Sequence, residues 1–492
     1  MKNARQASRF VLVSLLVTLS LFAASCGSAA PAPLPTQAPV PTSSPFPTQA
    51  PLPPATNAPA AAAPTAAPTE APAAAPTAAP TSAPAASGGD QITLTLWDIY
   101  PAGQPFRTVE DNAIARFNKQ YPNVKVNVVS YAINDFKTKL VTSLAAGGKD
   151  FDIFQTWGGG QLATYARRGQ VLDITSYMNQ DNWKARFSNA ALTFVTADNK
   201  VWGVPVELAT VLVFYNTDIF KTNGVSVPKN FDDLVGACKT FKSKGIIPFA
   251  LGMGSGAQWV GDFFYQYLVT RQGGVDPFRK AITRETGGTF EDPTFVKSAQ
   301  MTQQMVDAGC FQDGFAGVQY ASMRQLLYQG KAAMVLMGSW LPGQIATEAP
   351  DFMSKLDYFR FPVITGGKGV DTDVVGGTNA AYAIAKSTKY PAEAVALLKE
   401  LSSEATANDV VTVAKRLSAT KMTLDPAKTD PLTIRVFGEL NNATAVQLYY
   451  DQSSTPGLAQ DHLDQLTALM AKTTTPEQMC KDWEASAKKE LQ

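Results

Sequence analysis

Histidine is almost absent from this sequence of 492 residues, because His462 is the only one. Zinc sites usually draw on several imidazole or thiolate ligands, and Ser-His-Asp or Cys-His nucleophiles need a histidine as their base. The composition therefore excludes a His-rich metal site and argues against catalysis by such a nucleophile. We expect no catalytic residues, no metal and no cofactor.

Cysteine is also scarce, with four residues in the chain. Cys238, Cys310 and Cys480 show neither a CxxC pair nor another spacing typical of metal ligands. Their odd number allows at most one disulfide within the chain and leaves one thiol over. We expect these three to be buried structural cysteines, and Cys26 to have a different role.

The chain lacks an excess of either charge, with 42 Lys and Arg against 41 Asp and Glu. Three of the basic residues, Lys2, Arg5 and Arg9, lie in an amino-terminal segment that we expect to be removed. The remainder has 39 basic and 41 acidic residues, a formal charge of −2, and no basic cluster. Since nucleic acids are bound through clustered Lys and Arg, we expect no nucleic-acid partner.

No apolar run is long enough for a comfortable membrane span, which takes about 20 residues. Residues 10–24 form a shorter apolar stretch, broken by Ser and Thr, that follows a basic start and ends in small residues before Cys26. This pattern predicts a secretion signal over residues 1–25.

The segment LFAASC at 21–26 resembles a lipobox, in which the cysteine is acylated and becomes the new amino terminus. The pattern prefers Leu where this chain has Ala23. The resemblance implies a lipoprotein signal peptide and a lipid anchor at Cys26 on the outer face of the cytoplasmic membrane, either extracellular or periplasmic. A plain cleaved signal with an incidental cysteine is the alternative.

A tract rich in Pro, Ala and Thr occupies most of residues 26–89. It has too few large apolar residues to offset the entropy of ordering, and its prolines favour an extended chain. We expect a disordered linker between the lipid anchor and a folded region. The roughly 400 residues that follow suffice for two domains.

The folded region begins with alternating strand and helix patterns. Strand patterns occupy 92–97, 124–128 and 151–154, and helix patterns occupy 106–117 and the surroundings of Leu140 and Leu144. This alternation predicts a parallel sheet covered by helices. Ligands bind outside the carboxyl ends of such strands, so we expect Trp97 and residues 155–160 to open onto one edge.

A second region begins near residue 204 and has the same character. The expected strands are 211–215, 246–250, 332–337 and 380–385, and the expected helices are 231–242 and 392–401.

Five segments, in order along the chain, resemble family 1 extracellular solute-binding proteins, the group that includes maltose-binding protein. They are FNKQYPNVKVNV at 117–128, DIFQTW at 152–157 with GQVLDIT at 169–175, VWGVPVELATVLVFYNTDIF at 201–220, LYQGKAAMVLMGSW at 327–340 and GGTNAAYAIAKSTKYPAEAVALLKEL at 376–401. The resemblance implies an α/β chain with the two-lobed periplasmic-binding-protein type II fold, a hinge and a cleft between the lobes. By analogy, the first lobe takes 90–205 and 374–412, and the second takes 206–373 and 413–492.

Such a cleft would hold a solute, and aromatic platforms suit the apolar faces of a sugar. Trp97, Trp157, Trp259 and Trp340 follow strands or lie in glycine-rich loops, so they are the candidate platforms. Trp340 matches an NGPW-like segment of the family, which makes it the first choice. Core packing is the alternative for each.

Planar polar groups suit sugar hydroxyls, and the candidates are Asp152, Gln155, Glu207 and Asn379. The family places a glutamate near the hinge, and Glu207 matches that position. The alternative role for Glu207 is a structural ion pair at the hinge. The alternative role for Asp152 is to cap the end of a strand. Tyr215 is a candidate to stack or to donate a hydrogen bond, unless it belongs to the core. Gly377 would let backbone N–H groups approach the solute, with a simple turn as its alternative.

The resemblance implies capture of a mono- or oligosaccharide for an ATP-binding-cassette importer, with no enzymatic activity, by a monomer that closes about its hinge. The expected partners are the carbohydrate and the transmembrane subunits of the permease. A non-sugar solute such as a polyamine, an anion or iron is one alternative. A carbohydrate-active enzyme on a similar scaffold, and a sensory or adhesive lipoprotein, are the others.

Overall fold

The computed structural model describes residues 91–491. The predicted signal, the lipidation site Cys26 and the linker 26–89 lie outside the described residues. The strands are β1 (Ile92–Asp98), β2 (Val124–Ser130), β3 (Ile153–Thr156), β4 (Thr196–Ala197), β5 (Lys200–Val201), β6 (Val204–Asn216), β7 (Ile247–Phe249), β8 (Ala332–Gly338), β9 (Leu356–Phe359), β10 (Val374–Ile384), β11 (Leu417–Ser418) and β12 (Val446–Leu448).

Helices separate most of these strands. They are α1 (Pro105–Gln120), α2 (Ile133–Ala145), α3 (Gly159–Arg167), α4 (Thr175–Met178), η1 (Trp183–Arg186), α5 (Asn189–Thr193), α6 (Thr217–Asn223), α7 (Phe231–Ser243), α8 (Trp259–Gly273), α9 (Asp276–Ile282), α10 (Pro293–Asp307), η2 (Phe315–Gly317), α11 (Tyr320–Tyr328), α12 (Leu341–Glu348), η3 (Pro350–Lys355), α13 (Pro391–Leu401), α14 (Glu404–Thr412), α15 (Pro431–Asn441), α16 (Tyr450–Ser453), α17 (Pro456–Met470) and α18 (Pro476–Glu490).

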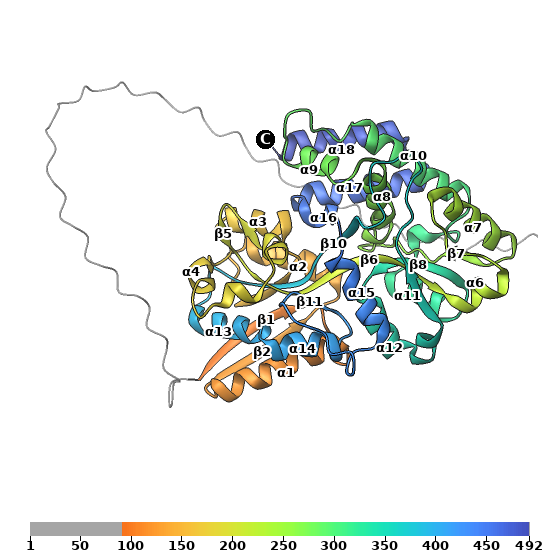
Figure 1. Ribbon diagram of the computed structural model, residues 1–492. Coiled ribbons are helices and arrows are strands. Elements are labelled where there is room, and N and C mark those ends of the chain that lie inside the picture. The colour runs from red at the N-terminus through yellow and green to blue at the C-terminus, as the bar shows by residue number, and fades with distance from the viewer. Residues whose placement is uncertain (1–90, 492) are drawn as a thin grey trace, which may run out of the picture. The chain divides into compact units, whose positions relative to one another are not determined.

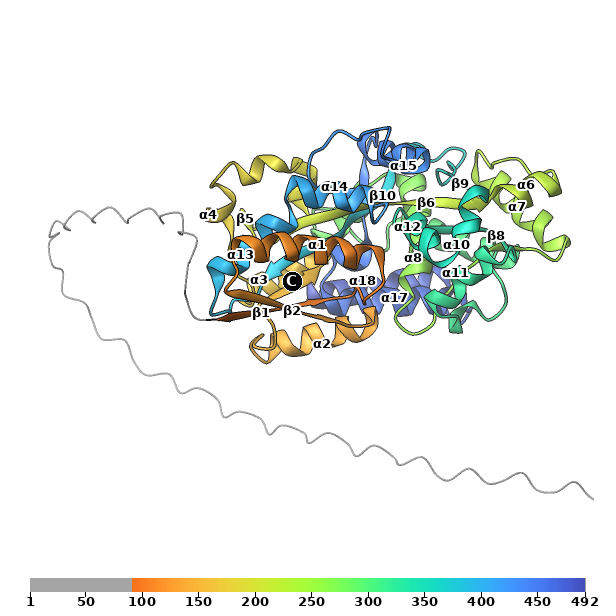
Figure 2. The ribbon, with the colours of Figure 1, turned by 90° about the horizontal axis from the view of Figure 1, so that it is seen from below.

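The first strands form as the apolar alternation predicts. β1 runs parallel to β2 and to β3. Helix α1 begins with a proline in its first turn, which suits a helix start, and buries Phe106, Val109, Ala113 and Phe117 along one face. Figure 2 shows α1 and α2 on opposite sides of the edge formed by β1 and β2.

The prediction of a parallel sheet holds for β1, β2 and β3 but not for the sheet as a whole. The main sheet has the order β2-β1-β3-β10-β6-β8-β7, and its central strand β10 runs antiparallel to both β3 and β6. β8 is also antiparallel to β6, whereas β7 is parallel to β8. The sheet is therefore mixed, because its two longest strands, β6 and β10, are antiparallel neighbours at its centre.

Two separate hydrophobic cores pack on this sheet. The first core draws on residues within 94–206 and 380–414, and the second on residues within 209–375 and 417–487. We call the parts built around them the first lobe and the second lobe. α1 packs against α13 and α14 in the first lobe, and α8, α10, α17 and α18 pack together in the second.

β6 and β10 connect the two cores. Val204 and Val206 of β6 belong to the first core, whereas Ala209 and the residues beyond it belong to the second. β10 runs the other way, with Val375 in the second core and Ala380 in the first. Figure 1 shows both strands passing through the middle of the folded region. We call the stretch where they pair, 204–210 with 376–382, the strand crossing.

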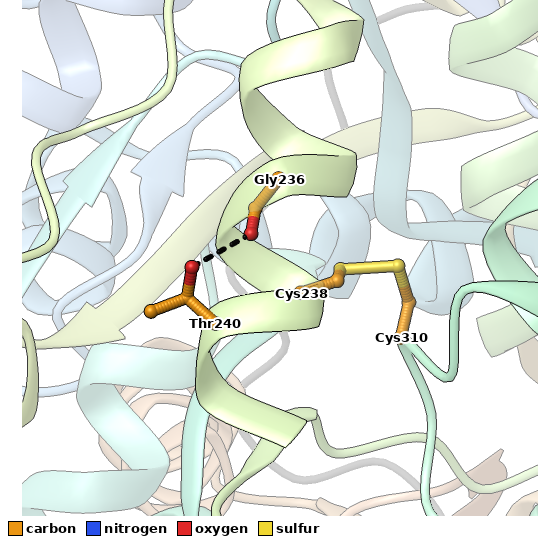
Figure 3. Close-up of a disulfide and its surroundings, with 4 residues drawn as sticks. All are labelled: Gly236, Cys238, Thr240 and Cys310. Carbon is orange, nitrogen blue, oxygen red and sulfur yellow. Dashed lines mark hydrogen bonds between the residues drawn. A yellow bond between two sulfur atoms is a disulfide. The ribbon is translucent and has the colours of Figure 1, made fainter. Parts of the chain in front are cut away.

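A disulfide stabilises the second lobe. Cys238 on α7 is bonded to Cys310, which lies in the loop after α10, with their Cα atoms 4.9 Å apart (Figure 3). Cys480 is a buried free thiol on α18. The expectation of at most one bridge among buried cysteines is confirmed.

Among residues 91–491, none of the helices combines the length and the apolar character that a membrane crossing would require.

Candidate functional site

A cavity lies between the two lobes beside the strand crossing. Its larger part, which we call the near cavity, has a volume of ≈ 420 Å³. A narrow continuation of ≈ 50 Å³, which we call the neck, shares five lining residues with it. The shared residues are Ile133, Trp157, Trp259, Trp340 and Asn379.

The second lobe contributes an aromatic wall. Trp259 contacts Tyr320, Phe263 and Trp340, with ring centroids 5.2, 5.4 and 6.1 Å apart. Phe263 in turn lies 5.5 Å from Tyr449. These rings line the near cavity or the neck. We call this set the second-lobe wall; because its members pack on one another, each ring is held by its neighbours.

Trp340 is fixed in this wall by its backbone and by its indole nitrogen. It follows β8 through Gly338, where an added Cβ would overlap the Trp340 ring, so the strand end can carry only a glycine there. The indole Nε1 donates to the Tyr320 hydroxyl at 3.0 Å, and that hydroxyl donates to Gln344 Oε1 at 2.8 Å. Burial raises the pKa of Tyr320 above its ordinary value, which lies well above neutral pH already, so the hydroxyl can donate this hydrogen bond.

A charged pair packs against the Tyr320 ring. The Arg324 guanidinium lies 4.3 Å from the centre of the Tyr320 ring, and it pairs with Glu348 at 2.6 Å. The arginine is thereby neutralised by a neighbour while its face covers the aromatic ring.

The first lobe contributes a wall with fewer interlocked rings. Trp157 follows β3, and its ring meets the edge of Phe136 at a centroid distance of 5.9 Å. The chain then turns at Gly158, which has a φ of 78° and where a Cβ would collide with the backbone of Phe194. Lys137 Nζ lies 5.2 Å from the centre of the Trp157 ring. Together with Tyr131, these side chains form what we call the first-lobe wall.

Polar contacts join the two lobes at the rim of the cavity. Lys137 of the first lobe pairs with Asp451 of the second at 3.6 Å. Asn134 Nδ2 donates to the backbone carbonyl of Ser255 at 2.7 Å. Burial raises the pKa of Asp451, an effect that the Lys137 ammonium opposes. Both contacts are cross-lobe links that depend on how near the lobes lie.

A buried network occupies the strand crossing at the bottom of the cavity. Glu207 on β6 accepts from Arg416 Nη1 at 2.9 Å and from Asn379 Nδ2 at 2.9 Å. Glu207 has no exposed surface, and Arg416 is 4% exposed. Burial raises the pKa of Glu207 against the pull of Arg416. Burial is also the largest single effect on Arg416 and lowers its pKa, but Glu207 and the nearby tyrosines together raise the pKa above its ordinary value. The ion pair that was the alternative for Glu207 is thus present.

Four of the predicted site residues come together in the cavity lining: Trp157, Trp259, Trp340 and Asn379. Glu207 lies directly behind Asn379. Gln155 is buried beneath the same strand and donates to the backbone carbonyl of Asn379 at 3.3 Å.

The other predicted residues lie elsewhere. Trp97 is 7% exposed and packs against Tyr131 and Phe151 at centroid distances of 5.0 and 4.7 Å, beneath the cavity surface. Asp152 accepts from Thr95 N and Thr388 Oγ1, which is a strand cap.

Tyr215 and Gly377 also lie outside the lining. Tyr215 stands at the far end of β6 and contacts Phe220 and Phe359. Gly377 lies in the strand crossing, where an added Cβ would meet the ring of Tyr449 at 3.3 Å. Its small size therefore serves the packing of a lining residue.

Several lining residues were not predicted. Tyr131 comes directly after β2, so the rule used for Trp97 would have found it. Tyr320 and Tyr449 stand at or just before the start of helices, and Lys137 lies within α2. No local pattern distinguishes these three, because long-range packing alone brings them to the cavity.

Within residues 91–491, no group of three or more His, Cys, Asp or Glu side chains is placed to hold a metal ion. The cavity lining combines aromatic rings, amides and hydroxyls with the charged side chains of Lys137, Asp451, Arg324 and Arg416.

Comparison with known sequences places these features in a family. Residues 101–408 match the bacterial extracellular solute-binding proteins. An uncharacterized ABC transporter extracellular-binding protein of Pyrococcus horikoshii is 29% identical over 261 residues, which are 52% of this chain and 57% of that protein. The arabinooligosaccharide-binding protein of Bacillus subtilis is 25% identical over 313 residues, 60% of this chain and 66% of that protein. The chain thus spans less than two thirds of the length of these curated relatives.

A solved structure matches over a longer stretch. It comes from work on xylan utilization by the thermophilic bacterium Caldanaerobius polysaccharolyticus, is 34% identical, and has a TM-score of 0.75. The match covers 80% of this chain and 100% of that one. The predicted resemblance and the two-lobed α/β fold are both confirmed. With a match over more than half of its residues and two lobes that enclose a cavity, the chain belongs to the family of bacterial extracellular solute-binding proteins.

Proposed function

We propose that this protein captures an uncharged carbohydrate in the cavity between its lobes and delivers it to the permease of an ATP-binding-cassette importer. The observation that carries the proposal is the convergence of Trp157, Trp259 and Trp340, from both lobes, on one cavity. Sugars present apolar C–H faces that such rings can cover.

Amides and hydroxyls in the same lining suit the rim of a sugar ring. Gln104, Gln344 and Asn379 supply amides, and Tyr131 and Ser130 supply hydroxyls to the near cavity. Amides both donate and accept, as sugar hydroxyls do. Trp259 Nε1 is a further donor: it is buried, and no acceptor for it occurs among residues 91–491.

The charges around the cavity favour an uncharged ligand over an anion. Arg324, Arg416 and Lys137 line it, and each already has a carboxylate partner within 4 Å. An anionic solute would have to compete with those carboxylates. This pairing supports a sugar over a phosphonate-like solute.

The relatives support the same class of ligand. One is named as an arabinooligosaccharide-binding protein, and the solved structure belongs to work on xylan utilization. A binding protein of this family acts with a permease, and reversible closure would bring both walls onto the sugar. We propose lobe borders of 90–205 with 374–412 and 206–373 with 413–492, and a motion centred on the strand crossing.

We further propose that the protein acts as a monomer, without enzymatic activity, at the cell envelope. A signal at 1–25, a lipid anchor at Cys26 and a linker over 26–89 would hold the lobes outside the cytoplasmic membrane. Incorporation of a labelled fatty acid into the full chain, and its loss in Cys26→Ala, would test the anchor.

Thermal unfolding with a panel of sugars tests the main proposal. A ligand that binds only the folded state adds about 2.7 kcal/mol at a concentration 100 times its Kd. We expect at least one neutral sugar to raise the melting temperature, and spermidine, phosphate and ferric citrate to leave it unchanged. Stabilisation by one of these three and by no sugar would overturn the proposal. Release of shorter sugars on incubation would instead indicate an enzyme.

A further inference from the structure

A second cavity of ≈ 290 Å³ has Trp157 in its lining, and Trp157 is the one lining residue that it shares with the near cavity. We call it the far cavity. It shares Lys137, Trp157 and Asp451 with the neck, and the neck shares five lining residues with the near cavity, Trp157 among them. Trp157 lines all three spaces, and the neck shares more lining residues with each cavity than the two cavities share with each other, so we place the neck between them.

We infer that the ligand is a linear oligosaccharide that runs from the near cavity along Trp157 and through the neck into the far cavity. The inference rests on the proposed function, because it assigns a ligand class to the same site.

The far cavity has a lining suited to a sugar unit. Gln161 and Gln460 supply amides, and Tyr165 supplies a ring with a hydroxyl. Val141 is 39% exposed there, which is unusual for a large apolar side chain in this protein. Apolar carbon beside amides is the combination that a pyranose ring requires, with C–H faces and hydroxyl rims.

The neck can admit a chain because one flexible side chain, that of Lys137, borders it. Lys137 Nζ stands 3.6 Å from Asp451 Oδ2, which is beyond normal hydrogen-bond distance. The Lys137 side chain is 33% exposed and has a long flexible stem. A shift of this stem would widen the passage, and the ammonium and carboxylate would then face the hydroxyls of a passing sugar.

A single sugar ring would use only part of this surface. A ring in the near cavity has no contact with Gln460 or Val141, which line only the far cavity. A chain that spans both cavities contacts both sets of residues and keeps Trp157 covered between them. Affinity should therefore grow with chain length until both cavities are filled.

Calorimetry with two length series tests the inference on the full chain. One series runs from xylose to β-1,4-linked xylotetraose, and the other from glucose to α-1,4-linked maltotetraose. In the series that binds, we expect the tetrasaccharide to bind at least ten-fold more tightly than the shortest member that binds. Equal affinity across the lengths, or tightest binding by a monosaccharide, overturns the inference and leaves sugar capture standing. Failure of every neutral sugar in the panel overturns both.

A matched pair of variants locates the end of the chain. Gln460→Ala in the far cavity should weaken the tetrasaccharide at least five-fold and leave the shortest bound sugar unchanged. Gln104→Ala in the near cavity should weaken both sugars alike. Both side chains are exposed or half-buried, so the fold should tolerate the changes. Unchanged tetrasaccharide binding by Gln460→Ala would place the sugar outside the far cavity and overturn the inference.

Discussion

The two walls of the cavity are built differently. In the second-lobe wall, Trp259, Phe263, Trp340 and their neighbours hold one another by ring contacts, and Trp340 is further tied to Tyr320. In the first-lobe wall, Trp157 stands on a glycine turn, with one aromatic contact beneath it. This difference indicates two separate roles. The second-lobe wall is a preformed platform that receives the ligand, and the first-lobe wall is more adjustable and closes on it.

The largest effect is a loss of stability, and it is expected from the buried Glu207–Arg416 ion pair at the strand crossing. Arg416→Met leaves Glu207 buried with only Asn379 as partner. Breaking a buried ion pair in this way costs about 3–5 kcal/mol, so the free energy of unfolding in urea should fall by that amount. Arg167→Met is the control, because its pair with Asp198 is exposed on both sides and its loss should leave the free energy of unfolding almost unchanged. Equal losses in the two variants would show that the crossing does not depend on this pair.

The next largest effect should come from the second-lobe wall. Trp340→Ala removes a ring that Trp259, Phe263 and Tyr320 hold in place. Central aromatic anchors contribute about 2 kcal/mol or more to binding, so calorimetry should show sugar affinity reduced about 30-fold. The matched control is Trp202→Ala, a half-buried tryptophan whose Nε1 donates to Ala197 O outside the lining. Unchanged affinity in Trp340→Ala would show that this ring is not part of the sugar-binding site.

A smaller loss is expected from the first-lobe wall. Trp157→Ala removes the ring that the near cavity, the neck and the far cavity share. We expect affinity to fall about ten-fold, or about 1.4 kcal/mol, because this wall has to move into place. The dissociation rate in stopped flow should rise more than the association rate falls. A loss greater than that of Trp340→Ala would reverse the comparison between the walls.

The smallest effect should come from the cross-lobe ion pair. Lys137→Met retains the stem over Trp157 and removes the charge that faces Asp451. Partly exposed pairs contribute about 0–1 kcal/mol, so affinity should fall by less than about five-fold. Raising the salt concentration should reduce the affinity of the unchanged protein slightly and that of the variant hardly at all. If the unchanged protein and Lys137→Met showed the same salt dependence of affinity, the Lys137–Asp451 pair would have no part in closure of the lobes.

The fold could be predicted where the signal is local. β1, β2, α1 and α7 follow from alternation, helical spacing and their end signals, and the structure confirms them. The antiparallel course of β10 could not be predicted, because it depends on pairing with strands far away in the chain. β6 also extends well beyond the predicted 211–215, since its two halves are buried in different cores and show no alternation.

The site could be predicted only in part, for a related reason. Position after a strand identified Trp157 and Trp340, and a glycine-rich loop identified Trp259, all of which line the cavity. The same rule selected Trp97, which lies beneath Tyr131 instead. A strand end fixes the edge of the sheet, but the direction of each side chain depends on its place in the pleat.

The exchange of β6 and β10 between the cores has a consequence for how the nascent chain acquires its structure. The first core stays incomplete until residues 380–414 have been synthesised, and the second needs residues as late as 487. The halves are therefore interlaced along the chain, and a cut anywhere between residues 206 and 380 would divide the first core. Because such distant segments must meet, folding should be slow. The first half should become resistant to proteases only once residues 380–414 are present, and the second only once residues as late as 487 are present.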